Sequence, residues 1–217
     1  MKKIVALLLA LVLVCAGFAA CSAEDGKITD EAENTTINSD VVEEDTTAAD
    51  NGTDEVIITE SQPDAVTADI PTATVLEEIK NVLGDYYGAD ADIPAEFLAD
   101  TYGVKPEWVK EYSAQMPMIS FRIDTHMVIK ANEGFAGDVE KALNDYQTYQ
   151  VENSMQYPMN VPKLKAARVY RLGDYVFYIL TGYVPDEYMD DEEGAYNYAA
   201  KNNQMVVDKV TELLLAK

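Results

Sequence analysis

The side chains that could most readily take part in catalysis lie on one short stretch, where the single histidine of the chain, His126, follows Ser120 and Asp124. A serine nucleophile, a histidine base and an aspartate together would suggest acyl-transfer chemistry. Their spacing does not favour it, because Ser120 and His126 would lie about 20 Å apart along an extended strand. We therefore interpret this stretch as a solvated polar strand face. Asp124 and His126 are kept as members of a candidate binding surface, and we expect no catalytic residues.

Carboxylates offer a second route to catalysis. Two carboxyl groups held about 5–9.5 Å apart across a cleft can hydrolyse a glycosidic bond. An alternative function is therefore a carboxylate-dependent hydrolase of cell-wall or surface polymers, using two of Asp90, Asp92, Asp124, Asp186 and Glu187. The acidic runs lack the regular ligand spacing of a calcium-binding EF-hand loop. The motifs GxGxxG, GxxxxGK[ST], HExxH and GxSxG are absent from the sequence, so we expect no metal and no cofactor.

Tyrosine is the more informative excess, since all 14 tyrosines follow residue 85. Tyrosine gives a large contact area at low entropic cost and is enriched in binding surfaces. Some, such as Tyr146 and Tyr178, fit buried positions, and packing remains the alternative role for the rest. With Asp124 and His126, four tyrosines form the candidate binding surface for a protein or a polysaccharide: Tyr86, Tyr87, Tyr196 and Tyr198.

Both cysteines, Cys15 and Cys21, lie in the first 21 residues, so the remainder of the chain has no disulfide and no thiolate nucleophile. Two lysines and an apolar run over 4–15 are typical of a secretory signal. Phe18-Ala19-Ala20-Cys21 resembles a bacterial lipobox, which predicts a lipoprotein signal peptide over 1–20 and lipidation of Cys21. Two or more acyl chains would hold the protein on the extracytoplasmic face of the cell membrane. The alternative is an ordinary signal peptide cleaved after Ala20.

Charge defines the next segment. The 217 residues include 39 acidic and 16 basic side chains, for a net charge of -23, which disfavours contact with nucleic-acid phosphates. Between Ser22 and Ile70 there is no aromatic residue, and Lys27 is the sole base. Such a composition cannot bury enough apolar surface to offset the entropy of ordering it. We expect residues 21–70 to be the lipidated Cys21 followed by a disordered acidic linker.

The elements that must position these side chains follow from hydrophobic periodicity. Residues 71–217 are expected to form one α+β domain, with a mainly antiparallel sheet of about three to four strands packed against helices. Apolar and polar residues alternate over 119–131, which predicts one strand or two strands with a bend. Gly173 and Asp174 predict a tight hairpin turn. Expected helices span about 74–83, 106–112, 136–154 and 190–215, and the remaining strands span 166–172 and 175–182.

The order of these features is similar to that of a known family. A lipobox, an acidic linker, an alternating strand, an amphipathic helix and the hairpin from Val169 to Tyr178 follow one another. Over roughly residues 116–184 the chain resembles the lipoproteins of Gram-positive bacteria catalogued as domain of unknown function 4358. Members carry Asp-Glu where this chain has Asp124 and Thr125. The resemblance implies an exported lipoprotein with a small α+β domain, and it implies no catalytic residues.

Together these observations predict a membrane-anchored extracytoplasmic lipoprotein whose domain is a non-catalytic binding module. Its expected partners are the membrane, through the lipid on Cys21, and an envelope protein or polysaccharide, and nucleic acid is excluded by charge. The hydrolase remains the alternative.

Overall fold

A computed structural model describes residues 56–119 and 121–215. Their strands form one antiparallel sheet in the order β1-β2-β3-β5-β4. The predicted α+β class is confirmed, with more strands than expected. The predicted signal peptide, Cys21 and most of the predicted linker lie outside the described residues. The strands are β1 (Ala91–Asp92), β2 (Val109–Met116), β3 (Thr125–Ala131), β4 (Arg168–Leu172) and β5 (Tyr175–Leu180).

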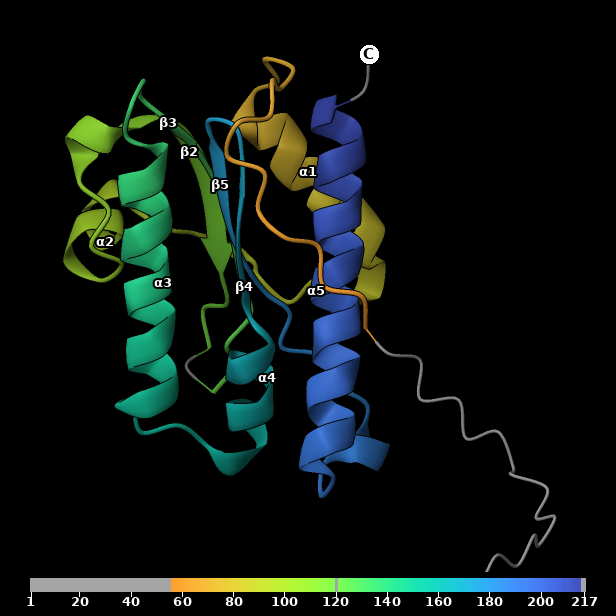
Figure 1. Cartoon of the computed structure of the whole chain (residues 1–217). Helices are drawn as coiled ribbons and strands as arrows, with labels where there is room; N and C mark the ends of the chain where they lie inside the picture. Colours follow the sequence, from red (N-terminus) through yellow and green to blue (C-terminus); the bar gives the residue numbers. More distant parts are fainter. Residues whose placement is uncertain (1–55, 120, 216–217) are drawn as a thin grey trace, which may run out of the picture. The chain divides into compact units, whose positions relative to one another are not determined.

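Helices cover both faces of this sheet (Figure 1). Helices α2 and α3 pack on one face, where α3 buries Val139 and Leu143 against Met127 and Tyr178. Helices α1 and α5 pack on the other face. Within the described ranges, no helix is both long and apolar enough to cross a membrane. The helices are α1 (Thr72–Leu83), α2 (Ala95–Asp100), α3 (Ala136–Glu152), α4 (Val161–Ala166) and α5 (Glu192–Leu215), with short 3-10 turns η1 (Gly84–Tyr86), η2 (Pro106–Trp108), η3 (Pro158–Asn160) and η4 (Asp186–Tyr188).

The predicted solvated strand face is wrong. Strand β3 is shorter than 119–131, and every residue of it is buried. One face meets α3, and the face with His126, Val128 and Lys130 meets the layer that contains α1 and α5. Sequence alternation describes a strand with one exposed face, whereas here the second face is covered by helices distant in the sequence.

The predicted helix over 106–112 is also wrong. Only Pro106–Trp108 is helical, as η2, and the chain then enters β2. Strand β2 pairs with β3 over several residues, including Tyr112 with Ile129, and this pairing satisfies backbone groups that an isolated helix would have satisfied locally. The expected helices near 74–83, 136–154 and 190–215 are confirmed, as is the hairpin, whose Gly173 has φ 57°.

The folded part begins before residue 71. Residues 59–70 run along the edge strand β4 and over α5, although the predicted linker extends to residue 70. Gln62 donates its N–H to the Arg171 carbonyl at 2.7 Å and accepts from the Gly173 N–H at 3.0 Å. The Tyr175 hydroxyl bonds both backbone groups of Ile70. An edge strand offers unpaired backbone groups, so a polar segment can be held there without a large apolar surface.

Candidate functional site

Four connections converge where β3 begins and β5 ends. They precede β1, join β2 to β3, join α3 to α4, and join β5 to α5. Asn160 donates its side-chain amide to the Phe121 carbonyl at 3.1 Å, and Tyr86 stacks on Tyr183 with ring centroids 4.8 Å apart. We call the exposed apolar side chains of these connections the methionine–aromatic rim. Its members are Tyr86, Met118, Ile119, Phe121, Met155, Tyr157, Met159, Tyr183 and Met189.

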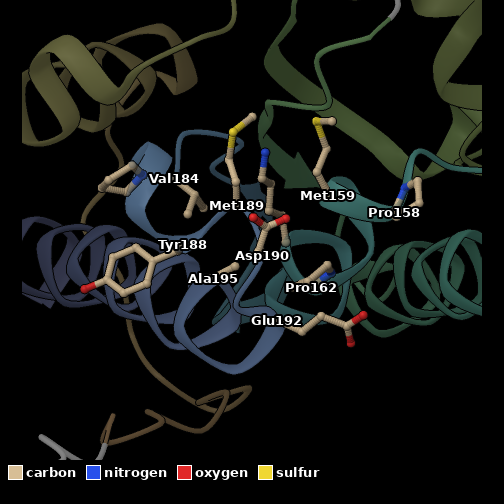
Figure 2. A pocket seen from close by; sticks show the side chains of 11 residues that line it. Pro158, Met159, Pro162, Val184, Tyr188, Met189, Asp190, Glu192 and Ala195 are labelled. Atoms are coloured by element: carbon tan, nitrogen blue, oxygen red, sulfur yellow. The ribbon is translucent and has the colours of Figure 1, made fainter.

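A groove of about 300 Å³ opens between two of these connections, the one from α3 to α4 and the one from β5 to α5, and its lining includes the rim members Met159 and Met189. Met159 comes from one wall and Met189 from the other, with the Asp190 carboxylate between them in the view of Figure 2. Exposed apolar side chains gathered around a hollow mark interaction sites. The lining residues are Pro158, Met159, Pro162, Lys163, Val184, Pro185, Tyr188, Met189, Asp190, Glu192 and Ala195.

Local sequence explains the two walls of the groove. Pro158 and Pro162 occupy the first turns of η3 and α4, where the missing N–H of proline costs no hydrogen bond. On the other wall, Pro185 immediately precedes η4, and Asp191 accepts from the Gly194 N–H at 2.9 Å in the first turn of α5. Both walls are therefore fixed by backbone geometry, while the methionines that project from them keep three rotatable bonds.

Charged side chains are distributed unevenly around the groove. Asp190 and Glu192 line one wall, and the segment from Tyr183 to Ala200 contains six acidic residues and no basic residue. Lys163 lies on the opposite wall. Burial lowers the pKa of Lys163, and the nearby Asp124 carboxylate opposes that change.

Asp124 is buried, with 2% of its surface exposed, and it contacts residues of several connections. Its Oδ1 accepts from the Gly182 N–H at 2.9 Å, and its Oδ2 lies 3.5 Å from Arg122 Nε. A Cβ added to Gly88 or Gly182 would lie 2.5 Å from atoms of the Asp124 carboxyl group, so both positions need glycine. Asp124 thus holds three connections together, and the prediction that it belongs to an exposed surface is wrong.

His126 is buried as well, and its predicted place on a binding surface is also wrong. Its ring is fully covered and stacks on Tyr87, with centroids 4.9 Å apart. Burial without a hydrogen-bond partner in the described residues lowers the pKa of His126 to about 3, so the ring is neutral near pH 7. Tyr87 is half-buried and donates its hydroxyl to Gln115 Oε1 at 2.9 Å. Burial raises the pKa of Tyr87.

The structure brings two of the predicted tyrosines together. The rings of Tyr86 and Tyr198 have centroids 6.4 Å apart, and Tyr188 lies 5.8 Å from Tyr198. Burial and the adjacent Tyr86 raise the pKa of Tyr198 to about 12. Because Tyr188 also lines the groove, the cluster is continuous with it. Tyr196 is exposed on α5 and interacts electrostatically with Arg168.

The five carboxylates of the hydrolase hypothesis occupy different settings. Asp90 accepts from the Met118 N–H at 3.0 Å, and Asp92 accepts from Gln115 Nε2 at 2.8 Å. Asp124 is buried, whereas Asp186 and Glu187 are exposed in η4. Among the described residues that line the groove, none is one of these five. Residues 56–119 and 121–215 also contain no group of three or more His, Cys, Asp or Glu side chains that could hold a metal ion.

Sequence reasoning missed the groove. Its most exposed apolar side chains, Met159 and Met189, lie in segments that carry no hydrophobic periodicity and were therefore expected to be loops. Met118 and Met155 share this property. A methionine in a loop has no core to fill, and several of them in separate loops would have been a signal for a shared surface. Ser120, the third residue of the catalytic pattern, lies outside the described residues.

Comparison with known proteins gives one match. Residues 84–181 match the family model described as "Domain of unknown function (DUF4358)", so this part of the chain is a domain of that family, and the resemblance to the domain seen in the sequence is confirmed. No curated protein and no solved structure matches the chain. The matched range includes all five strands and Asp124, and it includes Met159 but not Met189.

Proposed function

We propose that this protein with a DUF4358 domain is a membrane-anchored extracytoplasmic lipoprotein that binds another envelope protein through the methionine–aromatic rim and its groove. The observation that carries the proposal is the gathering of exposed apolar side chains on four converging connections, two of which line a groove that contains Met159 and Met189. Water-exposed apolar surface is costly, and a concentrated patch is characteristic of an interaction site. Methionine and aromatic residues are also enriched in protein interfaces.

A protein fits this rim better than a polysaccharide. Sugars require several directed hydrogen bonds beside an aromatic platform, whereas five of the nine rim side chains, among them Met118, Ile119 and Met189, are thioether or aliphatic groups without a hydrogen-bond donor. Flexible methionine side chains adapt to the irregular apolar surface of a protein. The polysaccharide remains a distinct outcome of the cross-linking experiment below.

The sequence supports the anchor. Lys2 and Lys3, the apolar run and Ala19-Ala20-Cys21 have the order of a lipoprotein signal. The first described residue, Val56, lines a hollow with Tyr188 and Tyr198, so the chain joins the folded residues beside the tyrosine cluster. An anchor on Cys21 would keep the rim close to other membrane-bound proteins, which raises their effective concentration.

The anchor is tested by cell fractionation with a lipid label. Cys21→Ser should abolish incorporation of labelled palmitate and move the protein out of the membrane fraction, because the acylated thiol is gone. Cys15→Ser is the matched control and should change neither readout. Retention of label and membrane association in Cys21→Ser would show that Cys21 is not the anchor.

The binding surface is tested by thiol-directed cross-linking on intact cells. Residues 22–217 contain no cysteine, so a single introduced thiol reports one position. Met189→Cys, at the groove, should give a discrete protein adduct. Glu133→Cys, at an exposed position between β3 and α3, is the matched control and should not.

Equal adducts from both positions, or no adduct from Met189→Cys, would contradict a binding surface at the rim. If digestion with glycan hydrolases removes the added mass of the adduct, the partner is a polysaccharide and the proposal of a protein partner is contradicted.

A further inference from the structure

We infer that the groove accepts a cationic amphipathic segment of its partner, with apolar side chains between Met159 and Met189 and basic side chains against the acidic wall. This inference rests on the proposed function and specifies the chemistry of the bound segment. It follows from the size and lining of the groove and from the distribution of charge around it.

The groove can hold apolar side chains but little more. Its volume of about 300 Å³ lies at the lower end of small-ligand pockets, which span roughly 300–1,000 Å³. The side chains of Pro158, Pro162, Val184 and Ala195 give it apolar surface. A peptide that places anchor side chains in the groove and leaves its backbone outside fits these dimensions, since helix-in-groove recognition uses a few spaced apolar anchors.

The negative charge around the groove favours a bound segment with positive charge. Asp190 and Glu192 line it, and Asp186, Glu187, Asp191 and Glu193 are exposed in the same stretch of chain. Complementary charge at an interface steers association and rejects partners of like charge. The one cation of the lining, Lys163, lies on the opposite wall near Asp124, which leaves the acidic wall for a partner.

Part of this acidity has a local structural role, and part does not. Glu192 and Glu193 lie in the first turn of α5, where the helix dipole favours negative charge, and Asp191 accepts a backbone N–H. These roles do not account for Asp186, Glu187 and Asp190, which precede the helix. The wall therefore carries more acidic side chains than its local structure requires.

The same charges disfavour the other apolar occupant, a membrane surface. An anionic leaflet attracts polybasic segments, and an acidic rim would be repelled by it. A cationic amphipathic segment satisfies both features of the groove at once, whereas a neutral apolar segment leaves the acidic wall unused.

The test measures binding of model peptides to the full chain in nanodiscs of zwitterionic lipid. The probe is a helical Lys/Leu peptide with leucines on one face. A Glu/Leu peptide of the same pattern and a Lys/Ser peptide of the same charge are compared with it. Because each leucine that enters the groove removes apolar surface from water, the Lys/Leu peptide should bind more than about tenfold tighter than Lys/Ser. Its affinity should fall with added salt.

Variants locate the site. Asp190→Asn/Glu192→Gln keeps the shape of the groove and should weaken Lys/Leu binding about three- to tenfold, as expected for the loss of two exposed ion pairs. Glu133→Gln/Glu212→Gln makes the same change in net charge at exposed positions on the other end of the sheet, and it should leave the affinity unchanged.

Equal weakening by both double variants would show that the peptide responds to the overall charge of -23 and would overturn the inference. Binding of Glu/Leu as tight as that of Lys/Leu would do the same. If Met189→Cys captures a protein in cells and the peptides still fail to discriminate, the inference fails while the proposed function stands. Absence of capture by Met189→Cys removes the proposed function itself.

Discussion

The centre of the sheet and the methionine–aromatic rim contain similar residue types in opposite environments. Met127 and Phe177 are fully buried, whereas Met189 and Phe121 are each 58% exposed. Polar groups show the reverse pattern. His126 is buried and neutral near pH 7, while Asp190 and Glu192 face solvent at the groove.

This comparison separates substitutions that should change the free energy of unfolding from substitutions that should change the free energy of binding. At the sheet centre, both faces of β3 and β5 are covered by helices, so side-chain substitutions should change the free energy of unfolding. At the rim, the apolar surface stays in water unless a partner covers it, so the same substitutions should change binding and leave stability almost unaffected. Asp124 connects the two regions, since it is buried but bonds the loop that leads to the groove.

The largest expected difference is between two phenylalanines. Phe177→Ala should lower the free energy of unfolding by about 3–5 kcal/mol, because it removes a fully buried ring and leaves a cavity. Phe121→Ala, at the rim, should change it by less than about 0.5 kcal/mol. Urea denaturation of the full chain measures both. Comparable losses for the two variants would erase the distinction between centre and rim.

The second prediction concerns the pH dependence of stability at His126. Its folded-state pKa of about 3 lies below the ordinary value of 6.5, so below about pH 6.5 the unfolded chain takes up a proton that the folded protein does not. The contribution of the neutral ring is therefore complete above pH 6.5 and declines as the pH falls toward 3. Between pH 7 and pH 5 the wild type should lose about 2 kcal/mol more than His126→Phe, which keeps a ring against Tyr87.

Denaturant titrations of the two proteins at pH 7 and pH 5 make this comparison. If both proteins lose the same free energy of unfolding between pH 7 and pH 5, His126 is accessible to protons in the folded protein and its face of β3 is open to water. The control is Lys105→Gln, which removes an exposed charge and should keep the wild-type pH dependence in this range.

The smallest expected change in stability is at the groove. Met159→Ser/Met189→Ser should leave the free energy of unfolding within about 0.5 kcal/mol of the wild type, since about half of each side chain is exposed and neither belongs to the buried core. The same double variant should bind the Lys/Leu peptide about tenfold more weakly, because the groove loses its apolar walls. A large loss of stability together with unchanged binding would show that Met159 and Met189 stabilise the fold and do not form a binding site.

Sequence periodicity predicted most elements of the fold because they follow local rules. Gly173 with Asp174 predicts the hairpin, and the apolar stripes predict α1, α3 and α5. The short helix expected over 106–112 failed because the pairing of β2 with β3 is a long-range interaction that overrides local preference. The sequence also could not show that the polar face of β3 is covered, since α1, which packs on that face, ends more than forty residues before β3 begins.

The candidate site was less predictable than the fold. Tyr86 and Tyr87 are adjacent in sequence, yet Tyr86 stacks on Tyr183 and Tyr87 stacks on His126. One partner lies in the connection from β5 to α5 and the other in strand β3, so no local pattern could separate an exposed ring from a half-buried one. The groove combines side chains of η3, α4, η4 and α5, and only the tertiary fold places Met159 near Met189.

One measurement compares both regions directly. The chain has eight methionines, and methyl labelling allows each to be followed by NMR in the full chain in nanodiscs while the Lys/Leu peptide is added. We expect the Met159 and Met189 methyl signals to shift with a saturable dependence on peptide concentration, while that of buried Met127 stays in place. A shift of the Met127 signal as large as theirs, or no shift at Met159 and Met189, would contradict a binding surface at the rim.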